Sequence, residues 1–128
     1  MKIVEDRQLG GWRGETQFRG TNVTFSIDAE LSRSNPKDIA SQALAELEHR
    51  WPEVVASLLG HPFSLYSESW AEPPAVSKEE FLRRLLITSL SIGEDTIFAY
   101  FSDGGLFAGH IVSIALIGKA APIAALEG

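Results

Sequence analysis

The stretch DGGLFAGH, residues 103–110, holds the residue types from which a reactive loop can be built. An aspartate beside a histidine can orient the imidazole as a general base, and glycines admit a ligand close to the backbone. Asp103 and His110 would form that pair, with Gly104 and Gly105 opening the backbone between them. One interpretation is therefore a small enzyme or ligand-binding domain that uses His110 and Asp103.

The same loop also fits a structural role. Asp-Gly-Gly supplies the backbone freedom of a turn or bulge, and Gly109 permits close backbone approach where a strand resumes. His110 would then satisfy a local polar group. The glycine spacing matches neither a phosphate loop nor a dinucleotide fingerprint, and no oxyanion-hole signature lies nearby. We favour this structural interpretation and predict no catalytic residue and no enzymatic activity.

Metal and cofactor chemistry has little support in the residue types. The chain has no cysteine, which excludes disulfides, thiolate zinc sites and a cysteine nucleophile. Its histidines are His49, His61 and His110. The first two are separated by a proline and a glycine and lack the facing spacing of a helical zinc motif. We predict neither a metal site nor a cofactor.

Charge favours one class of partner over another. The 17 acidic and 11 basic residues give a net charge of -6 at pH 7. Such a chain is poorly suited to tracking phosphates, so nucleic acid is not an expected partner. An acidic protein can, however, dock quickly on a basic one, because opposite fields steer their encounter. We predict the partner interface at the acids Glu46, Glu48 and Glu53.

Length and hydropathy indicate a single domain over residues 1–128. The most apolar region, residues 106–126, is interrupted by a histidine, a lysine and a proline, which favours a buried strand and a tail over a membrane span. Glu5 and Asp6 stand where a signal peptide needs its apolar core. We therefore expect a cytoplasmic protein without membrane association, present as a monomer or a homodimer.

The elements that must position these residues begin with two strands. Residues 12–19 and 23–31 alternate apolar and polar side chains, which is the period of a half-buried strand. The residues between them, Gly20-Thr21-Asn22, are types that accept positive φ. The two strands should therefore close as an antiparallel hairpin.

Helices are predicted next. Asn35 can cap a helix that has Pro36 at its first position. The apolar spacing of this segment continues across Pro52, which predicts two abutting helices or one kinked helix ending near Gly60. The stretch at residues 63–72 indicates another short helical piece.

The second half of the chain is predicted to contain one more helix and a meander of strands. Ser77 and Glu80 form a capping box for a helix that runs to about Leu86. Residues 87–92, 96–102 and 110–118 are rich in β-branched and aromatic residues and are predicted strands. The predicted fold class is α+β, in which an N-terminal β-hairpin, central helices and a C-terminal antiparallel meander form one sheet with the helices packed on one face.

Several residues match the motif of a known family. The motif is an acidic-glycine stretch, then Leu-Phe, one further residue and Gly-His, here Asp103, Gly104, Leu106, Phe107, Gly109 and His110. Trp12 with Gly14, and Ser69-Trp70, add to the match. In these residues, over about half its length, the chain resembles the uncharacterised bacterial family DUF2262.

The resemblance implies a function in binding. The family has no established enzymatic activity, and similar small domains are encoded beside polymorphic toxins and are thought to act as immunity proteins. It implies a protein that neutralises a cognate bacterial toxin domain by steric occlusion, with its acidic surface steering the encounter. Self-association through the apolar last strand is a further possibility that the residues leave open.

Overall fold

The computed structural model describes residues 1–31 and 34–127 and contains a sheet of seven strands. The strands lie across the sheet in chain order. They are β1 (Lys2–Glu5), β2 (Trp12–Phe18), β3 (Thr21–Ile27), β4 (Leu86–Gly93), β5 (Thr96–Ser102), β6 (Ile111–Ile117) and β7 (Ile123–Glu127). All neighbours pair antiparallel except β3 and β4, which are parallel. The predicted α+β fold class is confirmed.

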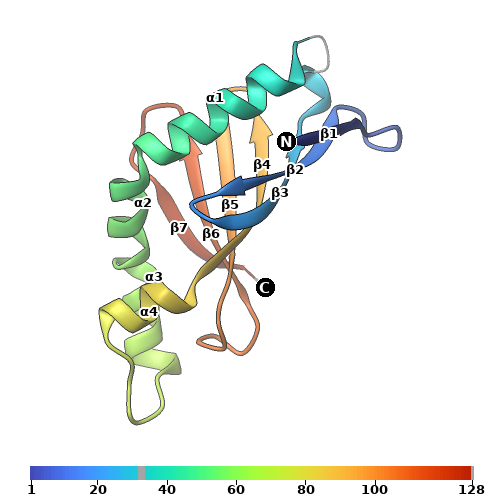
Figure 1. Ribbon diagram of the computed structural model, residues 1–128. Helices are drawn as coiled ribbons and strands as arrows, with labels where there is room; N and C mark the ends of the chain where they lie inside the picture. Colours follow the sequence, from blue (N-terminus) through green and yellow to red (C-terminus); the bar gives the residue numbers. More distant parts are fainter. Residues whose placement is uncertain (32–33, 128) are drawn as a thin grey trace.

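The helices form the connection between the two parallel strands and lie against one face of the sheet (Figure 1). They are a 3₁₀ turn (Ala29–Leu31), α1 (Pro36–His49), α2 (Trp51–Leu58), α3 (His61–Leu65), a π-helical stretch (Tyr66–Trp70) and α4 (Lys78–Arg84). Parallel pairing requires the chain to return to the starting end of the sheet, and these helices fill that crossover. Within the described ranges, none of them is long and apolar enough to cross a membrane.

The start of α1 and its junction with α2 follow the predicted signals. The Asn35 side chain accepts hydrogen bonds from the amides of Lys37 and Asp38. Pro52 falls in the first turn of α2, where a helix needs no amide donor, so the chain forms two abutting helices across it.

The start of α4 departs from prediction in one detail. Ser77 accepts a hydrogen bond from the amide of Glu80, as predicted. The Glu80 carboxylate, however, pairs with Arg83 and Arg84 on its own helix. These two cations lie three and four residues further along, where a helix brings side chains together, and they take the carboxylate that a capping box would use.

The sheet is larger than predicted, because β1 and β7 were not expected. Both lie at the edges of the sheet, and both are only four or five residues long. The hairpin between β2 and β3 is also tighter than predicted. Its loop is Arg19-Gly20, both with positive φ, and β3 already begins at Thr21. Such a two-residue loop matches the twist of the strands it joins.

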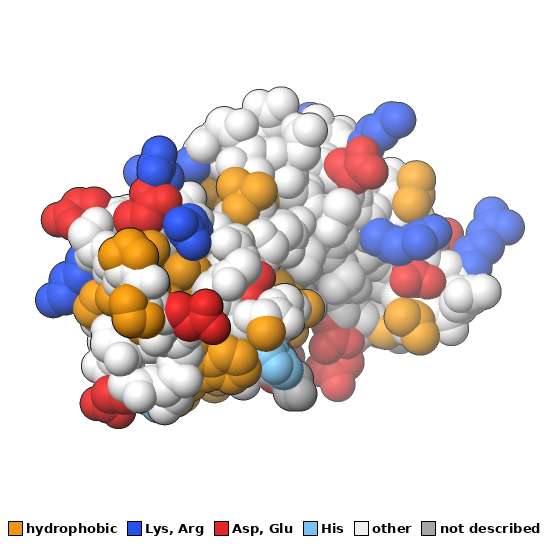
Figure 2. All heavy atoms as spheres, turned by 90° about the horizontal axis from the view of Figure 1, so that it is seen from below, with side chains coloured by type: hydrophobic (Ala, Val, Ile, Leu, Met, Phe, Trp, Pro, Cys, Tyr) orange, Lys and Arg blue, Asp and Glu red, His pale blue; other side chains and the backbone are white. Residues whose placement is uncertain are grey.

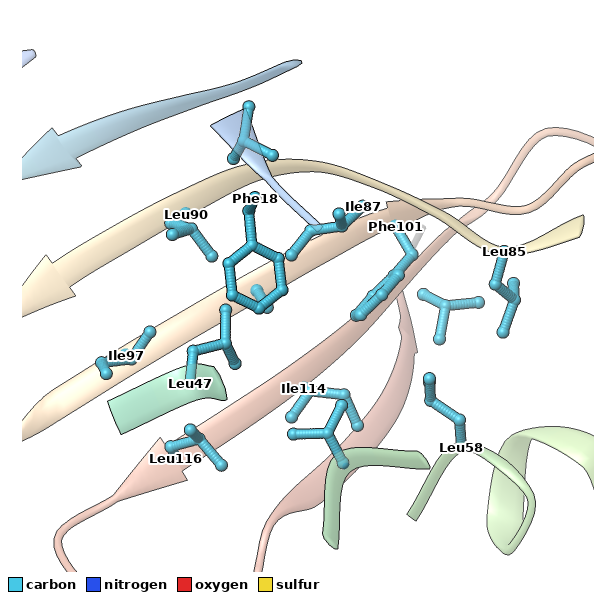
Figure 3. Close-up of a cluster of buried hydrophobic side chains, with 14 of the residues drawn as sticks. Phe18, Leu47, Leu58, Leu85, Ile87, Leu90, Ile97, Phe101, Ile114 and Leu116 are labelled. Carbon is cyan, nitrogen blue, oxygen red and sulfur yellow. The ribbon is translucent and has the colours of Figure 1, made fainter. Parts of the chain in front are cut away.

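The hydrophobic core lies between the sheet and the helices (Figure 3). Phe101 and Ile114 point into it from β5 and β6, and Leu47 and Leu58 meet them from α1 and α2. Alternate residues of β3 and β5 face this layer, which is the period that the sequence shows, and a bulge at Thr88 interrupts the alternation in β4. The core therefore fixes which side chains of every strand remain on the opposite face.

A buried cation ties the helices to the sheet. The Arg50 side chain is only 7% exposed and lies at the corner between α1 and α2. Its guanidinium donates to the carbonyl oxygens of Gly118 (3.1 Å) and Ala120 (2.6 Å), in the turn between β6 and β7, and to the Glu53 carboxylate (2.9 Å). The hydrogen bond to Glu53 is the main cause that raises the pKa of Arg50. Arg50 thus holds the helix corner against the turn.

Replacing Arg50 with methionine should test this role. The variant keeps an apolar stem of similar length but leaves the two turn carbonyls without their donor. We expect the free energy of unfolding, measured by urea denaturation, to fall by about 2–4 kcal/mol. Arg83→Met is the matched control, because Arg83 is 77% exposed and should cost less than about 1 kcal/mol. Equal losses in both variants would contradict the proposed role.

Candidate functional site

The loop between β5 and β6 is organised by one carboxylate. Asp103 is 6% exposed. Its Oδ1 accepts a hydrogen bond from the amide of Gly105 (3.1 Å), and its Oδ2 accepts from those of Phe107 (2.8 Å) and Gly109 (2.7 Å). Burial alone would raise the pKa of this carboxyl, but the three amide donors outweigh burial and hold the pKa below its ordinary value. The charged form is therefore the one that the loop requires.

The glycines of the loop serve two different needs. Gly104, Gly105 and Gly109 all have positive φ, which explains the choice of glycine. The close backbone approach occurs at Gly104, where a Cβ would overlap the carbonyl oxygen of Arg84. The predicted close approach at Gly109 is wrong, because a Cβ there would meet open space. Gly109 serves to turn the chain so that its amide reaches Asp103.

The Leu-Phe pair fastens the loop to the core. Leu106 and Phe107 are buried, and Phe107 is among the fully buried side chains. Its ring meets the edges of Phe81, Tyr66 and Trp70 at centroid distances of 6.1, 6.2 and 5.8 Å. These aromatic contacts join the loop to α4 and to the π-helical stretch.

His110 completes the same contact network. Its ring lies 5.6 Å from that of Trp70 in an edge-on arrangement, and its Nδ1 lies 3.2 Å from the carbonyl oxygen of Glu127. The Ser69-Trp70 part of the family motif therefore meets the loop part in space, although about 40 residues separate them. Asp103 directs both carboxylate oxygens at backbone amides, so the Asp103–His110 pair of the enzyme interpretation is not formed.

The other motif pair also has a packing explanation, because Trp12 packs against the hydrophobic core and Gly14 makes room for its neighbours. A Cβ at Gly14 would overlap the ring of Phe25 on β3 and the carbonyl oxygen of Lys2 on β1. Glycine at this position lets the aromatic ring fill the core beneath the strand and lets β1 approach closely. Gly14 thus contributes to the seating of β1.

The hollow beside the loop has a mixed lining. It measures about 330 Å³, and its charged lining residues are Glu72 and Arg84, next to Tyr66 and Trp70. Seen from below, hydrophobic side chains gather over the part of the molecule that carries α3 and α4 (Figure 2). Across residues 1–31 and 34–127, no group of three or more His, Asp and Glu side chains is arranged to hold a metal ion.

The three acids predicted as an interface are in different environments. Glu48 pairs with Arg19 (2.7 Å) and Glu53 pairs with Arg50 (2.9 Å), although both glutamates remain more than half exposed. The hydrogen bond from Arg50 lowers the pKa of Glu53. Glu46 instead lines a hollow of about 480 Å³ between α1 and the β4–β5 and β6–β7 turns. Glu94 and Asp95 line the same hollow, together with Arg50 and Lys119, so Glu46 belongs to a charged group with an excess of acids that the sequence alone did not reveal.

The face of the sheet turned away from the helices, which we call the outer face, was not predicted as a site. The strand register places its side chains in two rows, each crossing all seven strands from β1 to β7. One row is Val4, Arg13, Ser26, Ser91, Phe98, Ala115 and Ile123. The other is Lys2, Glu15, Thr24, Ser89, Tyr100, Ser113 and Ala125. The face therefore changes from charged through hydroxyl and aromatic to aliphatic.

The aliphatic end of the outer face carries a group of side chains that we call the outer patch: the exposed Ile111, Ile117 and Ile123, with the half-buried Ala125 and the buried Ala115 between them. The three isoleucines are 47%, 45% and 57% exposed. Phe98 and Tyr100 on β5 border the patch and are half-buried. The signal for it was present in β6, whose residues are apolar at nearly every position, as in a strand covered on both faces.

Comparison with known proteins gives one match. A family model described as an uncharacterised protein conserved in bacteria (DUF2262) matches residues 2–124. No curated protein and no solved structure matches the chain. The matched span contains all of the motif residues described above.

The role of Asp103 can be tested by Asp103→Asn. The asparagine NH₂ group would face the N–H groups of the loop, where a donor meets another donor. We therefore expect the free energy of unfolding of the variant to be about 1–3 kcal/mol lower than that of wild type at neutral pH. The folded pKa of Asp103 lies below the ordinary value of 3.8. The stabilisation is therefore present above that ordinary value and is lost as pH falls through the folded pKa.

Urea denaturation at a series of pH values measures this difference. The gap between wild type and Asp103→Asn should stay constant near neutral pH and should narrow below about pH 3.8, as the carboxylate is protonated. A gap that persists unchanged into strong acid would show that the charge of Asp103 does not hold the loop.

Proposed function

The chain belongs to DUF2262, a family of uncharacterised proteins conserved in bacteria, and from its structure we propose that it acts by binding another protein. In this proposal it is a cytoplasmic immunity protein that seats a cognate toxin domain on the outer patch and blocks the toxin sterically. It needs no catalytic group or cofactor for this. The outer patch is the observation that carries the proposal.

The outer patch has the properties of a protein interface. Single exposed apolar residues are normal on a protein surface, but a contiguous group with a polar border marks a place of association. Ile123 lies directly opposite Ala115 on the neighbouring strand, and Ala115 lies opposite Phe98. Directly opposed side chains on a sheet have Cβ atoms about 5 Å apart. The patch is therefore continuous from β5 to β7.

The patch is also pre-organised for binding. Its side chains stand on hydrogen-bonded strands, so little backbone freedom is lost when a partner docks. Isoleucine is β-branched and has few rotamers to lose. Phe98 and Tyr100 at the border add aromatic residues, which are enriched in interfaces. Ser113, between Ile111 and Ala115 on β6, is buried and donates to Glu127, so no free hydroxyl opposes burial there.

Acidic side chains supply the steering in this proposal. Glu46, Glu94 and Asp95 outnumber Arg50 and Lys119 in the lining of one hollow, and the net charge of -6 favours approach of a basic partner. Glu48 and Glu53 contribute less than Glu46, because they are held in ion pairs with Arg19 and Arg50, whereas Glu46 interacts with Arg50 without an ion pair among the described residues. The acids would thus act mainly on the rate of association, and the apolar patch on the lifetime of the complex.

The outer patch can be tested with Ile117→Lys and Ile123→Lys. The toxin would be the product of the gene adjacent to this one, assayed by rescue of growth and by the dissociation constant of the purified complex. A buried lysine should weaken binding by about 30-fold or more and abolish rescue. Val4→Lys is the matched control, because Val4 is 56% exposed and lies in the same row as Ile123 at the opposite edge.

Retention of rescue and affinity in both isoleucine variants would refute the proposed interface. Light scattering of the free protein separates the alternative occupant, a second copy of the chain. One combination of results would assign the patch to self-association: a dimeric wild type, monomeric lysine variants and unaffected rescue. The proposal would then be wrong.

The steering role can be tested with charge reversals. Glu46→Lys should slow association with the same toxin and weaken its dependence on salt, while the dissociation rate changes little. Glu48→Lys should have a smaller effect, because its charge is paired with Arg19. Stopped-flow mixing at several salt concentrations gives both rates. An association rate that is the same in wild type and Glu46→Lys would exclude steering by this group.

A further inference from the structure

The charged end of the outer face carries a repeated chemical pattern. From β2 to β5, one row reads Arg13, Ser26, Ser91 and Phe98, and the other reads Glu15, Thr24, Ser89 and Tyr100. Lys2 on β1 lies opposite Glu15. Each row thus presents a charged end, two hydroxyls and an aromatic ring on consecutive strands. Two adjacent rows with this order make one site.

The surface over these rows is hollow. A depression of about 590 Å³ is lined by both cations, Lys2 and Arg13, by Glu15 and by all four hydroxyl residues. A second depression of about 300 Å³ shares Ser26 and Ser91 with the first and is lined further by Phe98 and Trp12. The hydroxyl residues therefore connect the charged end to the aromatic end.

The polar groups here have no partners within the part of the chain that the structure describes. Lys2 and Arg13 form no ion pair there, although Arg19, Arg50, Arg83 and Arg84 all do. The hydroxyls of Thr24, Ser26, Ser89 and Ser91 likewise form no hydrogen bond to another described side chain or backbone group. Lys2 and Arg13 line the hollow and form no ion pair among the described residues, so their N–H donors are available to a ligand.

We propose that this groove binds a phosphorylated small molecule with a planar ring, of the mononucleotide class. Arg13 and Lys2 hold the phosphate, because a guanidinium and an ammonium both bind its oxygens. The serine and threonine hydroxyls, on the two strands between the cations and the aromatic rings, face the sugar hydroxyls. Phe98 or Tyr100 stacks on the ring.

The dimensions suit one nucleotide. Neighbouring strands are about 4.8 Å apart, so the backbones of β2 and β5 are about 14 Å apart. The long Arg13 side chain reaches part of that distance. A single-stranded nucleic acid would need a continuous track of basic side chains along its phosphates. This groove offers two cations in a chain of net charge -6, so a mononucleotide fits it better than a nucleic-acid strand does.

Calorimetric titration with adenosine monophosphate tests the proposal. The nucleotide should bind measurably, and adenosine and inorganic phosphate should each bind about tenfold more weakly or worse, because each lacks one of the two recognised groups. A short oligoadenylate should bind no tighter per site than the mononucleotide. Oligoadenylate binding that is much tighter would assign the face to nucleic acid and overturn the proposal, and so would equal binding of the nucleotide and adenosine.

Variants identify the two ends of the groove. Arg13→Gln should weaken the binding of adenosine monophosphate by about tenfold and leave the binding of adenosine unchanged. Phe98→Leu should weaken the binding of both adenosine monophosphate and adenosine and leave the binding of inorganic phosphate unchanged. Lys37→Gln, an exposed cation on α1, is the matched control, and unfolding curves show that each variant is folded. If Arg13→Gln behaves as Lys37→Gln does, the assignment of the phosphate end is wrong.

Discussion

Coverage of the sheet on one face only is the constraint on which the rest of this structure depends. Apart from the bulge at Thr88 in β4, every strand alternates between the helix-covered face and the outer face, so each core residue fixes the side to which its neighbours point. The inner positions are constrained by packing, as at Gly14, which makes room for the ring of Phe25. The outer positions are free of that constraint. Their order, from charged through hydroxyl and aromatic to aliphatic, is therefore available for recognition.

Two buried charges hold this arrangement together from opposite ends. Arg50 bonds two carbonyl oxygens of the β6–β7 turn, and Asp103 bonds three amides of the β5–β6 loop. Both direct their charge at backbone groups of the same chain, and both are buried. A buried charge is stable only when such partners are complete. These two residues therefore serve architecture, and the groups left free for partners lie on the outer face and around α1.

Much of the fold could be predicted from local chemistry. The caps at Asn35 and Ser77 and the break at Pro52 are signals within one or two turns of a helix, and the structure follows them. The edge strands β1 and β7 could not be predicted, because four or five residues carry too little periodicity and their pairing depends on the whole sheet. The register of β3 with β4 likewise joins segments that no local pattern connects.

The candidate site was predicted in part for the same reason. The residues of the loop at 103–110 were identified, but their roles were not, because a sequence does not show that Asp103 faces amides while His110 faces Trp70 and Glu127. Glu46 was identified without Glu94 and Asp95, which reach it only through the turns. The outer face required β7 and the register of all seven strands, so no segment of the sequence could reveal it by itself.

The parallel seam between β3 and β4 has a consequence for how the chain reaches this state. Each side of the seam, the β1–β3 ribbon and the β4–β7 ribbon, is built from neighbours in sequence and can form early. Thr24 and Ser89 meet only after the whole helical segment has been closed as a loop. Until then β3 and β4 are unprotected edges with apolar faces. Slow joining of two preformed halves, and edge-to-edge aggregation when it fails, are the kinetic liabilities of this architecture.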